Sequence, residues 1–158
     1  MTVNEYNIES HDLRDPQSFV SNSETYENEA FRYVSTGGDL VQGTPNSAGL
    51  DLQVHTVKGD VIGTGIYCQI PEGWVGLVVP RSSLGLKGFR LKNTMGVIDS
   101  DYRGEIKLAF EGYTPGPYER VAQLILVPHY VGAVERMISM EDLNKTDRNE
   151  GGFGSTGS

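Results

Sequence analysis

The stretch that decides the fold reads Gly104-Glu105-Ile106-Lys107-Leu108-Ala109-Phe110-Glu111-Gly112-Tyr113. Within it, large apolar residues alternate with Lys107, Ala109 and Glu111. Successive side chains of a β-strand point to opposite faces of the sheet, so this alternation predicts a strand with one face buried. The stretch therefore favours a chain built from sheets.

Short runs of the same kind lie on both sides of it. We expect further strands at residues 31–35, 50–56, 61–70, 74–79, 90–93, 120–127 and 133–139. Turn formers separate them at Gly37-Gly38-Asp39, Lys58-Gly59-Asp60, Pro71-Glu72-Gly73 and Pro115-Gly116-Pro117. No stretch has the 3.6-residue period of a long helix, although 139–142 is typical of the start of one short helical turn. Eight short strands predict an all-β sandwich, jelly roll or barrel.

Composition limits the class of protein. A length of 158 residues suits one domain with a hydrophobic core, and 20 glycines, roughly twice the usual share, favour turns. Cys68 is the single cysteine, so no internal disulfide can form, and a reducing compartment is the simplest interpretation. No signal-peptide pattern opens the chain and its apolar runs are too short to cross a bilayer, so we expect a cytoplasmic protein with no membrane partner.

The charge is unevenly distributed. The net charge of −8 argues against a general nucleic-acid binder. Residues 1–39 hold eight acidic and two basic residues, whereas residues 81–120 hold seven basic and five acidic ones. We interpret residues 1–28 as an acidic N-terminal extension, ordered at best in part. The middle of the chain can still receive an anion.

The segment Pro80-Arg81-Ser82-Ser83-Leu84-Gly85 ends a strongly apolar strand. A guanidinium and two hydroxyls at a strand end suit phosphate oxygens, although an ordinary polar turn has the same composition. Neither serine lies in a nucleophile motif, and the chain has no zinc or Walker pattern.

The segment Val97-Ile98-Asp99-Ser100-Asp101-Tyr102-Arg103-Gly104 leads from apolar residues into a carboxylate. Asp99 at the edge of the core could act as a general base, because burial makes a carboxylate a better proton acceptor. Two carboxylates at this spacing could instead bind metal, or cap a surface turn.

Three further features carry weaker signals. Gln123 lies in an apolar run, where a buried amide needs a partner or reaches into a site. Asn93 ends a strand and is more often a turn former than a base reader. The last residues combine Arg148, Phe153 and hydroxyls with four glycines, a composition that can wrap phosphate oxygens and offer a flat face to a base.

Taken in order, these segments resemble the five motifs of the homotrimeric dUTP pyrophosphatases, or dUTPases. The motifs read Ala48-Gly49-Leu50-Asp51-Leu52, Pro80-Arg81-Ser82-Ser83-Leu84-Gly85, Asn93 with Gly96-Val97-Ile98-Asp99-Ser100-Asp101-Tyr102-Arg103-Gly104, Glu119-Arg120-Val121-Ala122-Gln123-Leu124, and Arg148-Asn149-Glu150-Gly151-Gly152-Phe153-Gly154-Ser155-Thr156-Gly157. Five motifs in order are highly specific. The residues of the second motif and of Pro128-His129-Tyr130 look most like those of bacteriophage members.

The resemblance implies a distorted jelly roll of the β-clip type, assembled as a three-fold homotrimer with sites at subunit interfaces. The tail of one subunit would cap a neighbour's site. The reaction implied is hydrolysis of dUTP to dUMP and diphosphate, with Mg²⁺ held by the triphosphate and waters rather than by the protein. It implies a jelly-roll domain at 29–143 and a flexible lid at 144–158 after the extension at 1–28, which has no counterpart in the family. It also places the enzyme in the cytoplasm, that of the host if the source is a phage.

The resemblance also implies a role for each matching residue. Asp99 matches the carboxylate that activates the attacking water, and Tyr102 the ring beneath the deoxyribose. The uracil edge would be read by Asn93 and by the main chain of Gly96, Val97 and Ile98. Phosphate contacts would come from Arg81, Ser82, Ser83 and Gln123, and Lys107 aligns with a position lining the nucleotide site. In the tail, Arg148, Ser155 and Thr156 would hold the γ-phosphate, Phe153 would cover the uracil, and Gly154 between them would also contact substrate.

One departure and two alternatives stand beside this interpretation. Asn149 occupies a position where the family usually has Gly; Asn is the next best residue if that backbone needs a positive φ. A dCTP deaminase of the same fold would need a Glu where this chain has Ala109, which cannot move protons. A regulatory nucleotide-binding protein on this fold is the other alternative, and the intact Asp99 and tail favour catalysis over it.

Overall fold

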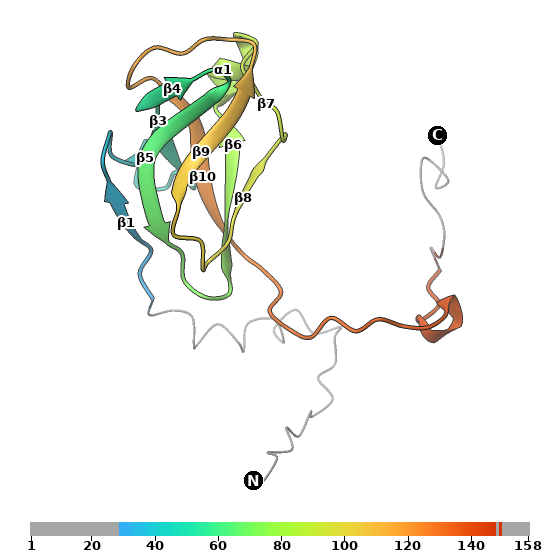
Figure 1. The fold of residues 1–158 in the computed structure, drawn as a ribbon. Coiled ribbons are helices and arrows are strands. Elements are labelled where there is room, and N and C mark those ends of the chain that lie inside the picture. Colours follow the sequence, from blue (N-terminus) through green and yellow to red (C-terminus); the bar gives the residue numbers. More distant parts are fainter. Residues whose placement is uncertain (1–28, 148, 150–158) are drawn as a thin grey trace.

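Two antiparallel sheets form the body of the protein, seen in a computed structural model that describes residues 29–147 and Asn149 (Figure 1). The first sheet has the order β1 (Arg32–Ser35), β5 (Val61–Gln69), β9 (Glu105–Glu111) and β7 (Arg90–Leu91), with β4 (Thr56–Lys58) also paired to β5. The second has the order β2 (Val41–Gln42), β3 (Gly49–Gln53), β10 (Arg120–Pro128), β6 (Trp74–Pro80) and β8 (Gly96–Ile98). The described residues add two short helices, α1 (Ser82–Leu86) and η3 (Met140–Asp142). The predicted all-β, jelly-roll-like class is confirmed.

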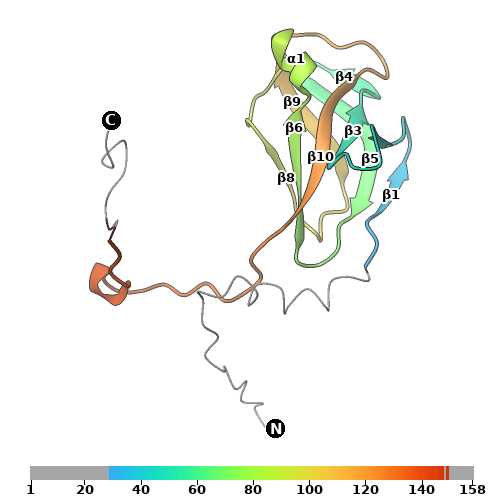
Figure 2. The same cartoon turned by 180° about the vertical axis from the view of Figure 1, so that it is seen from behind.

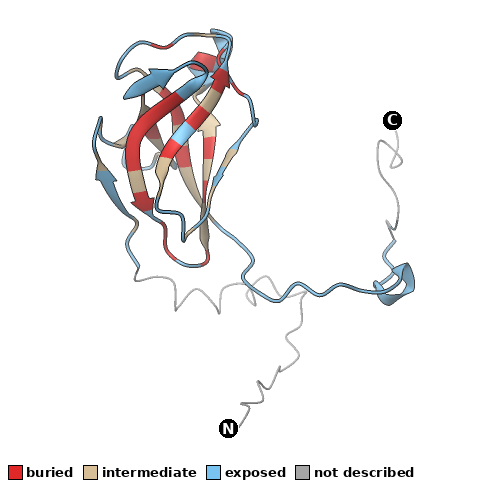
Figure 3. Cartoon of the chain, in the orientation of Figure 1, coloured by how far each residue is buried: buried red, intermediate tan, exposed pale blue. Residues whose placement is uncertain are grey.

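The hydrophobic core lies between the sheets, where the buried segments of the strands gather (Figure 3). Leu52 and Leu124 from one sheet and Ile62 and Ile106 from the other are completely buried. Each such side chain contributes about 1.5–3 kcal/mol relative to an exposed one. The alternation predicted for 104–113 is confirmed in β9, whose three large apolar residues are buried in turn.

Most of the predicted strands are confirmed, with some changes of length. The segment 90–93 pairs only over Arg90–Leu91, and the run 50–56 divides between β3 and β4. The predicted helical turn at 139–142 is present as η3, where Asp142 Oδ2 accepts from the backbone N–H of Ser139 at 3.1 Å. Helix α1 is unpredicted, since five residues are too few to show a period.

The strand predicted at 133–139 is wrong for the single chain. Figures 1 and 2 show the chain leading away from both sheets after β10, and residues 128–147 are all exposed. Val134 is 93% and Ile138 99% exposed. A strand needs a neighbour for its backbone hydrogen bonds, and no other described strand lies against this segment, which we call the arm (residues 129–147).

A bulge in β5 bends the first sheet beside β9. The pairing shifts between Gly63, opposite Lys107, and Tyr67, opposite Glu105. Within it Gly65 has a φ of +69°, and a Cβ there would lie 2.8 Å from the backbone nitrogen of Gly37, so only glycine fits. The bulge therefore fixes how the start of β9 meets β5.

The N-terminal extension at 1–28 lies outside the described residues, and the three-part division of the chain stays a prediction. Within the described part of the chain, every helix is too short or too polar to cross a bilayer.

Candidate active site

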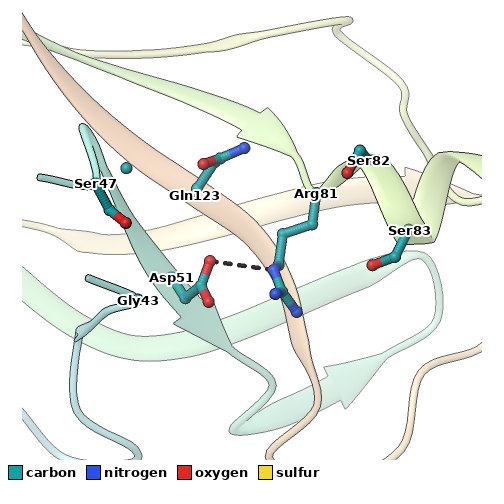
Figure 4. A pocket seen from close by; sticks show the side chains of 8 residues that line it. Gly43, Ser47, Asp51, Arg81, Ser82, Ser83 and Gln123 are labelled. Carbon is teal, nitrogen blue, oxygen red and sulfur yellow. Dashed lines mark ion pairs between the residues drawn. The ribbon is translucent and has the colours of Figure 1, made fainter.

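The first pocket, which we call the arginine pocket, has a volume of about 250 Å³ (Figure 4). Four of its residues were predicted from the sequence, namely Arg81, Ser82, Ser83 and Gln123. The other four, which sequence reasoning left without a role, are Gly43, Ser47, Gly49 and Asp51. The described chain thus brings its second and fourth motifs together as predicted, and adds the first motif and the loop before it.

Asp51 is the most informative of the additions. It is only 8% exposed, and its carboxylate pairs with Arg81 Nε at 3.1 Å (Figure 4). Arg120 Nη1 lies 3.1 Å from the other carboxylate oxygen. A buried carboxylate is costly unless charged partners and hydrogen bonds satisfy it. The arrangement therefore fixes the guanidinium of Arg81 at the pocket wall. A charged residue between Leu50 and Leu52 was the signal in the sequence that could have revealed it.

Gly49 makes room for the Gln123 side chain. The two residues lie on the neighbouring strands β3 and β10. A Cβ on Gly49 would lie 2.2 Å from Gln123 Oε1, a distance at which atoms collide. The carboxamide therefore lies across the α-carbon of a glycine, at the edge of the pocket.

Helix α1 carries the two hydroxyls. Arg81 precedes the helix in an extended conformation, and Leu84 on its inner side is buried. This anchor leaves Ser82 and Ser83 exposed on the pocket side, beside the guanidinium of Arg81. A cation next to hydroxyls is suited to bind phosphate oxygens.

The second pocket, which we call the tyrosine pocket, also has a volume of about 250 Å³. It is lined by Asn93, Gly96, Val97, Ile98, Asp99, Tyr102, Glu105 and Lys107. All of these except Glu105 were predicted site residues, and the structure brings them together.

Strand β8 forms one wall of the tyrosine pocket. It pairs with β6 and is the last strand of its sheet, and an edge strand presents backbone N–H and C=O groups that a ligand can bind. The turn before it is tight: Thr94 has a φ of +64°, and the N–H of Met95 donates to the carbonyl of Asn93 at 2.6 Å. Asn93 therefore reaches the pocket from a turn rather than from a strand.

The turn from Asp99 to Gly104 is held by its own residues. The N–H of Tyr102 donates to the Asp99 carbonyl at 3.1 Å, and Arg103 donates to the carbonyl of Ser100 at 2.7 Å. A Cβ on Gly104 would lie 2.3 Å from the Tyr102 hydroxyl, so the phenol ring folds back over a glycine. The ring remains 43% exposed, which leaves it free to pack against a ligand.

Asp99 follows the half-buried Ile98 at the end of β8 and is itself exposed. The described residues contain no group of three or more His, Cys, Asp or Glu able to hold an ion, and the alternative of a metal bound by Asp99 and Asp101 alone stays untested.

The predicted tail residues Arg148, Phe153, Gly154, Ser155 and Thr156 lie outside the described residues. Asn149 is described, and its φ is +40°, a conformation that Asn tolerates better than most residues with a Cβ. Its side chain accepts from the N–H of Thr146 at 3.1 Å, and its own N–H donates to the Thr146 hydroxyl at 3.1 Å.

The two pockets share no lining residue, yet both are attached to β6. On one side of this strand Gln123 lies opposite Val79, and on the other Gly96 lies opposite Val78. One pocket offers a guanidinium and hydroxyls, and the other offers an aromatic ring and backbone groups together with two carboxylates and the Lys107 ammonium. This division suits a ligand with an anionic end and a planar end.

A jelly-roll-like fold with such pockets is suited to a protein that binds a nucleotide. A family model described as dUTPase matches residues 37–157, and the chain belongs to this family. It is therefore an enzyme of the dUTP diphosphatase kind.

Relatives that are similar in sequence support this family membership. The chain is 42% identical over 134 residues to the deoxyuridine 5'-triphosphate nucleotidohydrolase of Escherichia phage T5, covering 73% of this chain and 89% of that protein. It is 43% identical over 128 residues to the enzyme of the same name from Finegoldia magna, covering 72% and 87%.

Solved structures share the fold. The dUTPase of Staphylococcus bacteriophage 80alpha with dUpNHpp matches with a TM-score of 0.69 at 23% identity, over 82% of this chain and 99% of that chain. A mutant dUTPase from phage phi11 of S. aureus, described with a structural Mg(II) ion, matches with a TM-score of 0.60 at 20% identity, over 72% and 99%.

Proposed function

We propose that this enzyme hydrolyses dUTP to dUMP and diphosphate, using a water activated by Asp99 to attack the α-phosphorus. One observation carries the proposal: the tyrosine pocket places Asp99 beside Tyr102 and the edge strand β8, in a cavity of about 250 Å³. A carboxylate there is next to a ring and to backbone groups suited to a nucleoside. The base would be read by Asn93 and by the backbone of residues 96–98, while Tyr102 would pack against the deoxyribose and exclude a 2′-hydroxyl.

In the chemical step, the water oxygen forms a bond to the α-phosphorus as its proton passes to the Asp99 carboxylate. The bond from the α-phosphorus to the bridging oxygen breaks, and diphosphate leaves with that electron pair. Phosphoryl transfer depends on positioning and charge neutralisation more than on covalent help. One proposed catalytic carboxylate, with cations and hydroxyls supplied by the two pockets, is consistent with that demand.

The arginine pocket would hold the phosphates. Arg81 offers a guanidinium already oriented by Asp51, and the Ser82 and Ser83 hydroxyls lie beside it. Lys107 would face the nucleotide from the tyrosine pocket. In the tail, Arg148, Ser155 and Thr156 would bind the γ-phosphate, with Phe153 and Gly154 closing over the base.

Magnesium fits the arginine pocket through its chemistry. The pocket offers hydroxyl and carboxamide oxygens, and oxygen is the donor that Mg²⁺ prefers. Mg²⁺ usually keeps several waters and binds substrate phosphates, so it needs no cage of protein ligands. Bound there, it would neutralise charge on the triphosphate, with Gln123 reaching it through a water.

We further propose a homotrimer in which the arm packs on a neighbouring subunit. The arm exposes Val134, Ile138 and Met140 at 93%, 99% and 71%, which is costly in water unless another surface covers them. A neighbour's sheet edge would also supply the partner that the predicted strand at 133–139 lacks. The arginine pocket of one subunit and the tyrosine pocket of another would then form one site.

Substrate comparison tests the proposal against its alternatives. Diphosphate release is measured with dUTP, dCTP, dTTP and UTP, with and without Mg²⁺, and ammonia release is measured in parallel. Rapid Mg²⁺-dependent release from dUTP alone is expected. Ammonia from dCTP would support the deaminase, although Ala109 offers it no acid or base, and dUTP binding without turnover would support a regulatory protein. Sedimentation tests the trimer, and we place the enzyme in the cytoplasm.

A further inference from the structure

Glu105 is the residue of the tyrosine pocket that has no role in the proposed reaction. It is the first residue of β9, directly after the turn that carries Asp99 and Tyr102. Its side chain is only 16% exposed, so its carboxylate is held largely inside the protein. A carboxylate in such a place requires partners, and each of its two oxygens has one.

The first oxygen has a structural partner. Glu105 Oε1 accepts from the backbone N–H of Gly65 at 2.9 Å, at the bulge where β5 loses its regular pairing with β9. The hydroxyl of Thr64 supports the same bulge by donating to the Ile106 carbonyl at 2.7 Å. Oε1 of Glu105 therefore satisfies the Gly65 N–H, a donor that the pairing between β5 and β9 leaves free.

The second oxygen faces the pocket. Glu105 Oε2 lies 3.5 Å from the ammonium nitrogen of Lys107, two residues along β9 and therefore on the same face of the sheet. Lys107 is 60% exposed, and a long side chain with this exposure loses much rotamer freedom when a ligand binds it. The Glu105 backbone carbonyl also accepts from the Tyr102 hydroxyl at 3.1 Å, so two pocket side chains depend on this residue.

We propose that Glu105 is a positioning residue that holds the Lys107 ammonium in place for the incoming nucleotide. Its Oε1 fixes the carboxylate to the β5 bulge, and its Oε2 thereby holds Lys107 at the pocket wall before substrate arrives. The side chain of Lys107 is then already ordered when the nucleotide binds. The inference rests on the proposed function, because it takes the bound molecule to be a nucleotide that Lys107 contacts.

The substitution Glu105→Gln separates the roles of the two carboxylate oxygens. The amide oxygen can still accept from Gly65, so the melting temperature is expected to stay near that of the wild type. The variant loses the ion pair to Lys107, so the Lys107 side chain must become ordered when the nucleotide binds. The entropy cost of that ordering weakens nucleotide binding by about two- to tenfold. The KM for dUTP and the Kd for dUpNHpp should both rise by that factor, while kcat stays nearly constant. Glu105→Ala should in addition lower the melting temperature, because the Gly65 N–H loses its acceptor.

Two comparisons make the test specific. Glu111→Gln is the matched control, since Glu111 lies on the same strand, pairs with Arg90 at 3.3 Å and lines neither pocket; its KM should not change. In a Lys107→Met background, Glu105→Gln should have no further effect on KM. An unchanged or lower KM in Glu105→Gln, or the same rise in the Lys107→Met background, overturns the inference. If the wild type releases no diphosphate from dUTP, it is the proposed function that fails instead.

Discussion

The carboxylate of Asp51 lies 3.1 Å from Nε of Arg81, and this ion pair ties the first motif of the chain to its phosphate-facing guanidinium. Arg120 shares the same carboxylate and also accepts a long hydrogen bond from Arg81 Nη1 at its backbone carbonyl, at 3.4 Å. The orientation of Arg81 is therefore set by the folded protein before any ligand binds.

Replacing Asp51 by Asn tests this relationship. The amide keeps the shape but loses the charge, and a hydrogen bond to a charged group is worth about 1.5–3 kcal/mol. We expect kcat/KM for dUTP to fall by roughly ten- to a hundredfold and the melting temperature to fall as well. Asp60→Asn is the control, because Asp60 pairs with Lys92 at the exposed surface, where ion pairs contribute little. Equal effects in both variants would remove the special role of Asp51.

Gly49→Ala should displace the Gln123 side chain without changing the chemistry of its carboxamide. The new methyl group would displace the carboxamide, whose oxygen would otherwise lie 2.2 Å away. We expect kcat to fall to the level of Gln123→Ala, and the double variant to be no worse than either single one. Gly116→Ala serves as the control, since a Cβ at Gly116 meets no atom within 4 Å. Additive losses in the double variant would show that the two residues act separately.

Asp99→Asn removes the proposed base. Because general-base catalysis contributes on the order of 10²–10⁴ in rate, kcat for dUTP should fall by that factor. Binding of dUpNHpp, measured by calorimetry, should persist, since the amide keeps the size of the side chain. Near-normal turnover would exclude Asp99 as the base.

Phe153→Ala tests the tail as a lid. Base stacking on an aromatic ring is worth roughly 1–3 kcal/mol, so the Kd for dUpNHpp should rise by about five- to 150-fold. Removal of residues 148–158 should reduce kcat severely yet leave the trimer intact in sedimentation. Monomers in that experiment would make the tail a structural element, and unchanged kinetics in Phe153→Ala would contradict its role as a lid.

Glu119 should make stability depend on pH. Burial alone would raise the pKa of this carboxyl, but the N–H of Gly116, the Tyr113 hydroxyl and the Lys87 ammonium outweigh it and hold the pKa below the usual 4.5. A pKa lowered in the folded state gives stability that is present above the unfolded pKa and lost as pH falls through the folded one.

Melting curves from pH 7 down to pH 3 check this expectation. Glu119→Gln should melt at a lower temperature than the wild type near pH 7, and the difference should shrink as pH falls below about 4.5. Glu72→Gln, at an exposed position outside the arm, should follow the wild type throughout. A constant difference between Glu119→Gln and the wild type would refute the linkage.

The tyrosine pocket was predictable from the sequence because its residues are nearly contiguous. Residues 93–107 hold all of its lining, so their order in the chain already places them together. Asp51 was missed because its partners lie 30 and 69 positions away along the chain, and only the pairing of β3 with β10 and of β10 with β6 brings them near it. The arm was predicted as a strand because its apolar pattern is real, yet pairing needs a surface that the single chain does not offer.

Strand β6 connects the two pockets of a subunit. Gln123 and Gly96 are attached to its two sides at neighbouring positions, so the spacing of the two pockets within a subunit is set by hydrogen bonds rather than by loops. A slip of one residue in either pairing would turn the affected side chains to the opposite face. An insertion within Trp74–Pro80 would therefore damage two half-sites at once.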